Sequence, residues 1–141
     1  MSKHNAEKWQ QMAAKFNMDP FATMIGMRIV ELDRGYAKVM LSLRPEHNSR
    51  IQRPHGGLIT TVLDHACGNA LDTMGRDTIG LQLSVSYIAG TKADDTVTAE
   101  ARVVHLGKTI GTAEATLTGS DGTVIAKALN TALVLGRRGS G

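Results

Sequence analysis

The residues most capable of catalysis or binding are a His-Gly-Gly sequence and an aspartate that follows it. His55, Gly56 and Gly57 come directly after Pro54, and Asp64 lies eight residues beyond Gly56. The residue before a proline avoids helical geometry, so a helix is expected to begin at the glycines. The first amides of a helix lack intrahelical acceptors. Because glycines have no Cβ atoms, a ligand can approach their amides closely. Such a helix start suits an anion or a developing oxyanion. The same residues also fit a tight loop-to-helix turn with no catalytic role.

Asp64 is the second candidate, because an aspartate in the middle of a helix has no capping role there. It lies on the polar stripe of the expected helix, which faces solvent, a cleft or a partner subunit. About 12 Å separates Gly56 from Asp64 at ~1.5 Å per residue. A base and an oxyanion donor must both lie within roughly 3–4 Å of one reacting group. If both residues are catalytic, we therefore expect a twofold dimer in which each chain contributes one of them to a shared site.

The elements that position these residues follow from hydrophobic periodicity. Apolar or small residues recur in pairs every four positions over 57–74, which predicts a long helix covered by something large. Later segments alternate with period two, and two of them carry Gly and Ala on one face, which leaves room for a helix. We predict strands at 27–33, 36–43, 79–87, 97–103, 111–117 and 124–135, helical segments at 7–17 and 20–25, and a loop at 44–54. The sum is one long helix wrapped by an antiparallel sheet.

Composition limits the function classes. The chain has 141 residues, of which 42% are hydrophobic and 21% charged, as expected for one folded domain. A net charge of +3 with 4% aromatic residues does not favour nucleic-acid binding, and a single cysteine excludes an intrachain disulfide framework. Neither a membrane span nor a signal peptide is recognisable. We expect a cytoplasmic protein without a membrane partner, whose first helix docks on the body; a substrate lid and a membrane-surface helix are the alternatives.

The pattern resembles the hotdog-fold acyl-CoA thioesterases of the phenylacetic-acid-degradation (PaaI-like) type. The residues that carry the resemblance span about 25–135: Asn48, His55-Gly56-Gly57, Asp64, Ala66, Gly68, Tyr87, the sequence from Val103 to Lys108, Asp121-Gly122 and Ala126. The resemblance implies an α+β hotdog fold, in which a long central helix is wrapped by a curved antiparallel sheet of five to six strands. It also implies a domain at 25–135, preceded by a helical extension at 1–24; we expect residues 136–141 to form a flexible tail.

The resemblance also implies roles for four residues. Asp64 matches the catalytic carboxylate, which activates water or attacks the thioester carbon, and Gly56 matches the residue whose backbone N–H polarises the thioester carbonyl. His55 and Asn48 match residues that position the thioester group. The family has two sites per dimer, which agrees with the helix-length argument, and many members pair dimers into tetramers. Some relatives carry a hydroxyl residue where Gly80 stands here.

These residues predict a thioesterase that acts on an aryl-acyl or medium- to long-chain acyl-CoA without a cofactor. An ordinary aspartate is ionised at neutral pH, so Asp64 is expected to act as a general base for water, with direct nucleophilic attack as the alternative. Arg50, Arg53 and Lys108 are candidates for binding the CoA phosphates, although ordinary surface charge also explains them. No metal-binding set is apparent. Two alternative hypotheses for the function are a hydratase or dehydratase of the same fold, and a module that binds acyl-CoA without turnover.

Overall fold

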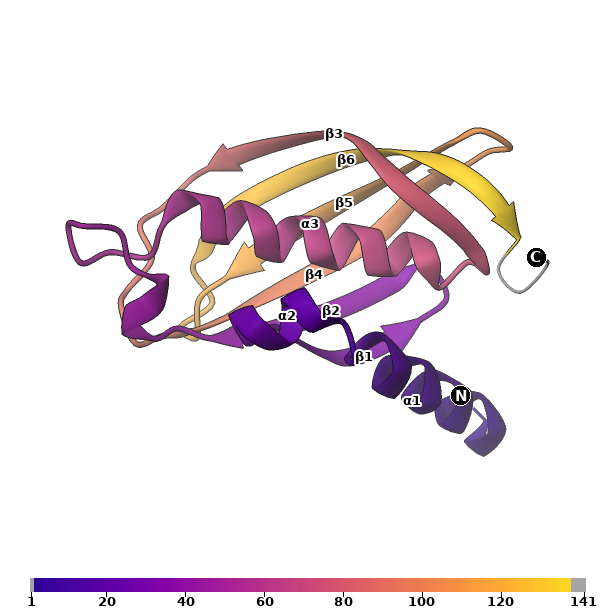
Figure 1. Ribbon diagram of the computed structural model, residues 1–141, viewed down its shortest axis with the longest axis horizontal. Helices are drawn as coiled ribbons and strands as arrows, with labels where there is room; N and C mark the ends of the chain where they lie inside the picture. The colour runs from indigo at the N-terminus through magenta and orange to yellow at the C-terminus, as the bar shows by residue number, and fades with distance from the viewer. Residues whose placement is uncertain (1, 138–141) are drawn as a thin grey trace.

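The computed structural model describes residues 2–137, in which one long helix is enclosed by a single curved sheet (Figure 1). All neighbouring strands are antiparallel, and the strand order is β1-β2-β4-β5-β6-β3. The elements are α1 (Lys3–Phe16), α2 (Pro20–Ile25), β1 (Arg28–Asp33), β2 (Tyr36–Ser42), a 3-10 turn (Pro45–His47), α3 (Gly56–Asp72), β3 (Arg76–Tyr87), β4 (Thr96–Leu106), β5 (Ile110–Thr118) and β6 (Val124–Arg137). The predicted fold class, an α+β hotdog fold, is confirmed, and the sheet, expected to have five to six strands, has six.

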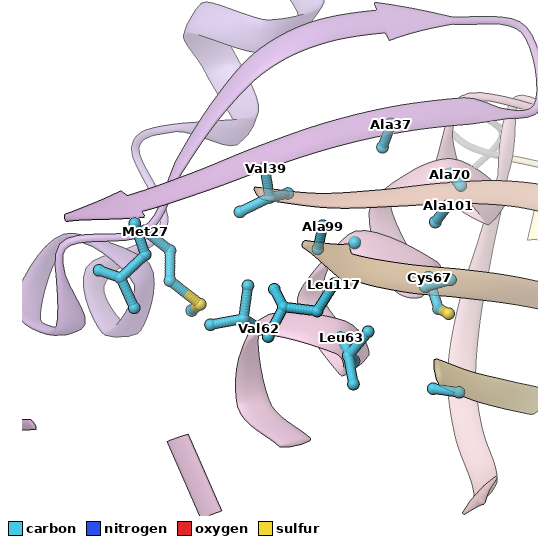
Figure 2. Packing of buried hydrophobic residues seen from close by; sticks show 14 of the residues in the cluster. Met27, Ala37, Val39, Val62, Leu63, Cys67, Ala70, Ala99, Ala101 and Leu117 are labelled. Atoms are coloured by element: carbon cyan, nitrogen blue, oxygen red, sulfur yellow. The ribbon is translucent and has the colours of Figure 1, made fainter. Parts of the chain in front are cut away.

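The apolar stripe predicted for the central helix is the face of α3 that packs against the sheet. Its buried members are Leu58, Ile59, Val62, Leu63, Ala66, Cys67, Ala70 and Leu71. Figure 2 shows several of them among small and apolar residues of the strands, including Val39, Ala99 and Leu117. A Cβ atom at Gly111 of β5 would lie 3.0 Å from a methyl carbon of Leu71. The small residues of the sheet therefore do make room for the helix, as the sequence predicts.

The two N-terminal helices form, and the first begins earlier than predicted. Periodicity places its start at residue 7, whereas α1 begins at Lys3 because the Ser2 hydroxyl accepts a hydrogen bond from the Asn5 N–H and caps the helix. Trp9 is buried against the body of the protein, so α1 is docked along β1. Asp19 caps α2, which ends at Gly26 in the left-handed conformation, with φ of 97°.

The strands are longer than the alternating segments that predict them. β3 begins at Arg76 rather than at residue 79, because backbone pairing with β6 continues past the point where apolar alternation stops. At the other end of the chain β6 extends through Arg137. The predicted flexible tail therefore begins inside a strand, which corrects the expectation for residues 136 and 137. The rest of that tail, residues 138–141, lies outside the described residues.

Candidate active site

The first turn of α3 leaves one backbone amide without an acceptor. The Nδ1 atom of His55 accepts the Gly57 N–H at 2.8 Å, and the His55 carbonyl accepts the Leu58 N–H at 3.0 Å. Of these first amides, only that of Gly56 has no acceptor within residues 2–137. Neither glycine amide has a partner inside the helix, as the sequence predicts, but the His55 side chain caps that of Gly57. Within residues 2–137, the Gly56 N–H is left without an acceptor at the positive end of the helix dipole.

His55 therefore has a structural role as well as a predicted one. Because its Nδ1 accepts a hydrogen bond, the neutral ring carries its proton on Nε2, and the exposed ring presents that N–H outward. Asn48 lies close by, since Asn48 and Pro54 form an isolated β-bridge and the His55 N–H donates to the His47 carbonyl at 2.9 Å. The positioning roles of His55 and Asn48 stay predictions, but the structure does bring both residues to the start of α3.

Tyr87 is a residue of this region that the sequence reasoning did not single out as functional. Its hydroxyl donates to the Gly56 carbonyl at 3.1 Å and also forms a hydrogen bond with the Thr60 hydroxyl. A hydroxyl has one proton to donate, so Thr60 donates to Tyr87 in this arrangement. The end of β3 thereby fixes the first turn of α3. The signal in the sequence was an aromatic residue ending a strand, which by itself does not indicate its partner.

Asp64 lies two turns further along α3, beside β3. It lines a hollow of about 360 Å³ together with Gly80, Leu81, Gln82 and Leu83 of β3 and Asn130 of β6. The side chain reaches solvent, yet the surrounding atoms desolvate its carboxylate and raise its pKa, an effect partly offset by the neighbouring His65. No described residue donates a hydrogen bond to this carboxylate, and none joins it to His65. A carboxylate whose oxygens accept no hydrogen bond from the protein is free to accept one from a water molecule, as general-base catalysis requires.

One chain does not bring Asp64 and Gly56, the predicted base and amide donor, to the same bond. Gly56 and Asp64 stand at the beginning and the middle of one straight helix, about 12 Å apart along its axis. Both lie near β3, which pairs with β6 on one side and, within the described residues, with no strand on the other. Within one chain, Gly56 and Asp64 are therefore too far apart to act on one thioester bond, as the helix length predicts.

The three cations proposed for CoA phosphates fall into two groups. Arg50 and Arg53 are exposed in the loop that precedes α3, which projects beyond the start of that helix in Figure 1. Lys108 is exposed in the turn between β4 and β5, which lies at the other end of the molecule, where Thr109 accepts the Val134 N–H. The structure thus brings the two arginines close to Asn48 and His55 but leaves the lysine apart from them in one chain.

Other chemically capable groups do not join this site. Cys67 is fully buried, and burial raises the pKa of its thiol to about 12, which makes it unreactive. His105 is exposed on β4. Over residues 2–137, no three His, Cys, Asp or Glu side chains cluster as metal ligands would. None of the described helices is long and apolar enough to cross a bilayer.

The fold is that of the hotdog thioester hydrolases, and Gly56 and Asp64 lie on its enclosed helix, where the sequence predicts the amide donor and the base. The family model described as Thioesterase superfamily matches residues 54–126, and the chain belongs to that superfamily. The match begins at Pro54 and so includes the Pro54-His55-Gly56-Gly57 sequence and Asp64. Pro54 is also the residue that forms the β-bridge with Asn48. The predicted membership is confirmed.

Individual relatives agree with this assignment. The acyl-coenzyme A thioesterase PaaI of Escherichia coli K12 is 29% identical over 103 residues, covering 73% of this chain and 74% of that protein. The E. coli PaaI structure superposes with a TM-score of 0.86 at 24% identity, covers 94% of this chain and 96% of its own, and supports the fold. A Streptococcus pneumoniae TIGR4 hypothetical thioesterase solved with coenzyme A has a TM-score of 0.82 and 26% identity, covering 89% and 98%. A 1,4-dihydroxy-2-naphthoyl-CoA hydrolase of Listeria monocytogenes is 31% identical over 87 residues, covering 60% and 70%.

Proposed function

We propose that the protein hydrolyses the thioester of an aryl-acyl or medium- to long-chain acyl-CoA, releasing the free acid and CoA. The proposal rests on one observation: within residues 2–137, the Gly56 N–H has no acceptor and the Asp64 carboxylate has no donor, and both lie on the central helix of a hotdog fold. Within the described residues Asp64 is the one titratable group that lines its hollow. A hydratase needs an acid and a base at adjacent carbons, so this hollow favours hydrolysis.

In the proposed mechanism Asp64 acts as a general base. Its carboxylate takes a proton from water as the water oxygen bonds to the thioester carbon, and the resulting oxyanion accepts the Gly56 N–H. The tetrahedral intermediate then collapses, the carbon–sulfur bond breaks, and the protonated Asp64 returns the proton to the departing thiolate. The raised pKa of Asp64 makes it a stronger base than an ordinary aspartate, which supports this role. His55 and Asn48 would position the thioester group.

The site is proposed to form across a twofold homodimer, and two such dimers are expected to pair. Ile79, Leu81 and Tyr87 of β3 are each more than half exposed, on the strand that has no neighbour on its outer side within residues 2–137. Pairing β3 with its symmetry copy would cover this apolar edge and set the two copies of α3 antiparallel. Asp64 of each chain would then approach the partner's Gly56, which removes the 12 Å separation.

The substrate class rests on the relatives and on the cations of the loop before α3. PaaI and the naphthoyl-CoA hydrolase act on CoA thioesters according to their names, and the S. pneumoniae structure holds coenzyme A. Arg50 and Arg53 are exposed beside the predicted positioning residues and would attract the CoA phosphates. Lys108 would reach a phosphate only from the other end of the molecule, so a contribution from it requires the partner subunit.

Thiol release tests the proposal directly. Phenylacetyl-, medium-chain and long-chain acyl-CoA would each be offered with a chromogenic disulfide reagent, alongside an N-acetylcysteamine thioester that lacks phosphates. Asp64→Asn is expected to reduce kcat by about 10²- to 10⁴-fold, since the base is lost. Asp72→Asn is a matched control on the same stripe of α3, because its Oδ1 can still accept the Thr78 hydroxyl; its activity should stay close to that of the parent protein.

Each outcome has a distinct meaning. No thiol release from folded protein with any of these substrates would contradict the proposed activity. Release that survives Asp64→Asn would keep the activity but remove Asp64 from the mechanism. Equal kcat/KM for the CoA thioester and the truncated thioester would show that the phosphates are not bound, and the proposed role of Arg50 and Arg53 would be wrong.

A further inference from the structure

Asn130 is the polar exception on the face of β6 that packs against α3. The other buried residues of that row are Ala126, Ala128, Ala132 and Val134. Asn130 is 3% exposed, and its Oδ1 atom has no donor within hydrogen-bond distance in residues 2–137. A buried acceptor without a partner costs about 1–3 kcal/mol. An alanine would continue the row and avoid that cost, so packing does not account for this residue.

The position of Asn130 relates it to the catalytic base. Its side chain lines the same hollow as Asp64, between α3 and the bulge of β3 at Leu81. The Asn130 amide nitrogen lies 3.9 Å from the point that a Cβ atom at Gly80 would occupy, and nothing else is within 4 Å of that point. A larger residue at position 80 would cover the amide. Gly80 therefore leaves the end of the Asn130 side chain open to the hollow, and a half-turn about its last bond presents either polar atom there.

Two polar groups without partners thus line one hollow, a carboxylate and a carboxamide. We infer that Asn130, together with Asp64, holds the water that attacks the thioester; this rests on the proposed function. The half-turn brings the Asn130 Oδ1 to the place of the amide nitrogen beside Gly80. The water then donates one hydrogen to the Asp64 carboxylate and the other to this Oδ1. Its lone pair then faces the thioester carbon, forming the new carbon–oxygen bond as Asp64 takes the first proton. The second hydrogen stays on the product carboxyl group, and the departing thiolate leaves with the proton from Asp64.

The test compares Asn130→Ala with Thr131→Ala, a change at the next residue of β6, whose side chain points to the other face of the sheet. We expect Asn130→Ala to lower kcat about 10- to 100-fold with KM nearly unchanged, because the water loses one of two contacts while the substrate loses none. The melting temperature should stay the same or rise, since an unsatisfied buried oxygen is removed. In added hydroxylamine the variant should also form more hydroxamate relative to free acid than the parent protein, because water loses its positional advantage. Thr131→Ala should change neither quantity.

A second variant keeps the inference testable if Asn130→Ala proves unstable. Asn130→Asp retains an acceptor oxygen but places a second carboxylate beside Asp64, so the acid limb of the kcat profile should move to higher pH. A kcat within twofold of the parent for Asn130→Ala, with an unchanged hydroxamate ratio, would overturn the role of Asn130 while loss of activity in Asp64→Asn keeps the proposed function. An unmoved acid limb in Asn130→Asp would also overturn it. An inactive parent protein would overturn both proposals.

Discussion

The two edge strands of the sheet, β1 and β3, have similar backbones, but only β1 is covered by another part of residues 2–137. β1 and β3 each carry a bulge with an exposed apolar residue, Val30 in β1 and Leu81 in β3. Beside β1 lies α1, and the Asn17 side chain donates to the Ile29 carbonyl at 3.0 Å and accepts the Ile29 N–H at 2.8 Å. The amide thus supplies the hydrogen bonds that a neighbouring strand would make. No described element covers β3 in this way.

The difference shows which edge the chain completes by itself. An exposed strand edge promotes association, and proteins usually cover or charge it. The β1 edge is covered within the chain, whereas the β3 edge keeps its exposed apolar residues and lies beside Asp64 and Asn130. Within residues 2–137, Asp64 and Asn130 therefore lie, without hydrogen-bond partners for their side-chain oxygens, beside the edge that no described strand covers. That is where we expect both a second copy of the chain and the substrate to bind.

Among changes at the two edges, the largest effect is expected from a charge on the β3 edge. Leu81→Arg would bring two arginines together across the proposed twofold axis, and we expect light scattering to give the mass of a monomer. Activity should fall by about 10²- to 10³-fold, because each Asp64 would lose the amide donor that the proposed dimer supplies. Val30→Arg is the matched change at the bulge of β1 and should alter neither mass nor activity. A Leu81→Arg protein that keeps the mass of a dimer would contradict this account of the β3 edge.

Removing the amide from the closed edge should affect stability instead of activity. Asn17→Ala leaves the Ile29 N–H and carbonyl without their side-chain partners, which should lower the free energy of unfolding by about 1–3 kcal/mol. Urea unfolding measures the loss, with Met18→Ala, an exposed neighbour, as control. kcat should not change, since neither Asn17 nor Ile29 lines the hollow of Asp64. A fall in kcat matching the fall in stability would show that the two edges are coupled.

The smallest expected effect is on the pH dependence of stability. Burial raises the pKa of Asp64 in the folded protein above its unfolded value of about 3.9, so ionisation opposes folding at neutral pH. Asp64→Asn should therefore raise the melting temperature at pH 7, and the gain should disappear as the pH falls below the unfolded pKa. Asp121 provides the opposite case, because the Thr123 N–H donates to its carboxylate and lowers its pKa. Asp121→Asn should lower the melting temperature at pH 7. If the two variants change the melting temperature in the same direction, the opposite pKa shifts given for Asp64 and Asp121 would be wrong.

Much of this site could be predicted because its signals are local. The position of Asp64 on the polar stripe, the start of α3 at the glycines and the separation between Gly56 and Asp64 all follow from sequence spacing along one helix. The order of the elements also followed from periodicity. The start of α1 was missed because its cap, Ser2, lies before the apolar repeat begins. The capping of Gly57 by His55 was missed because it depends on a side-chain rotamer.

The helix, the strands and the spacing between Gly56 and Asp64 can be predicted from the chain alone, since each depends on residues close together in it. The surroundings of Gly56 and Asp64 depend instead on how distant segments pack. Tyr87 reaches Gly56 and Asn130 reaches the hollow of Asp64 through strand pairing that joins distant segments. In the sequence Asn130 is one residue of a long apolar strand. The register of β6 against β3, which local spacing does not encode, places it beside Asp64, the proposed catalytic base.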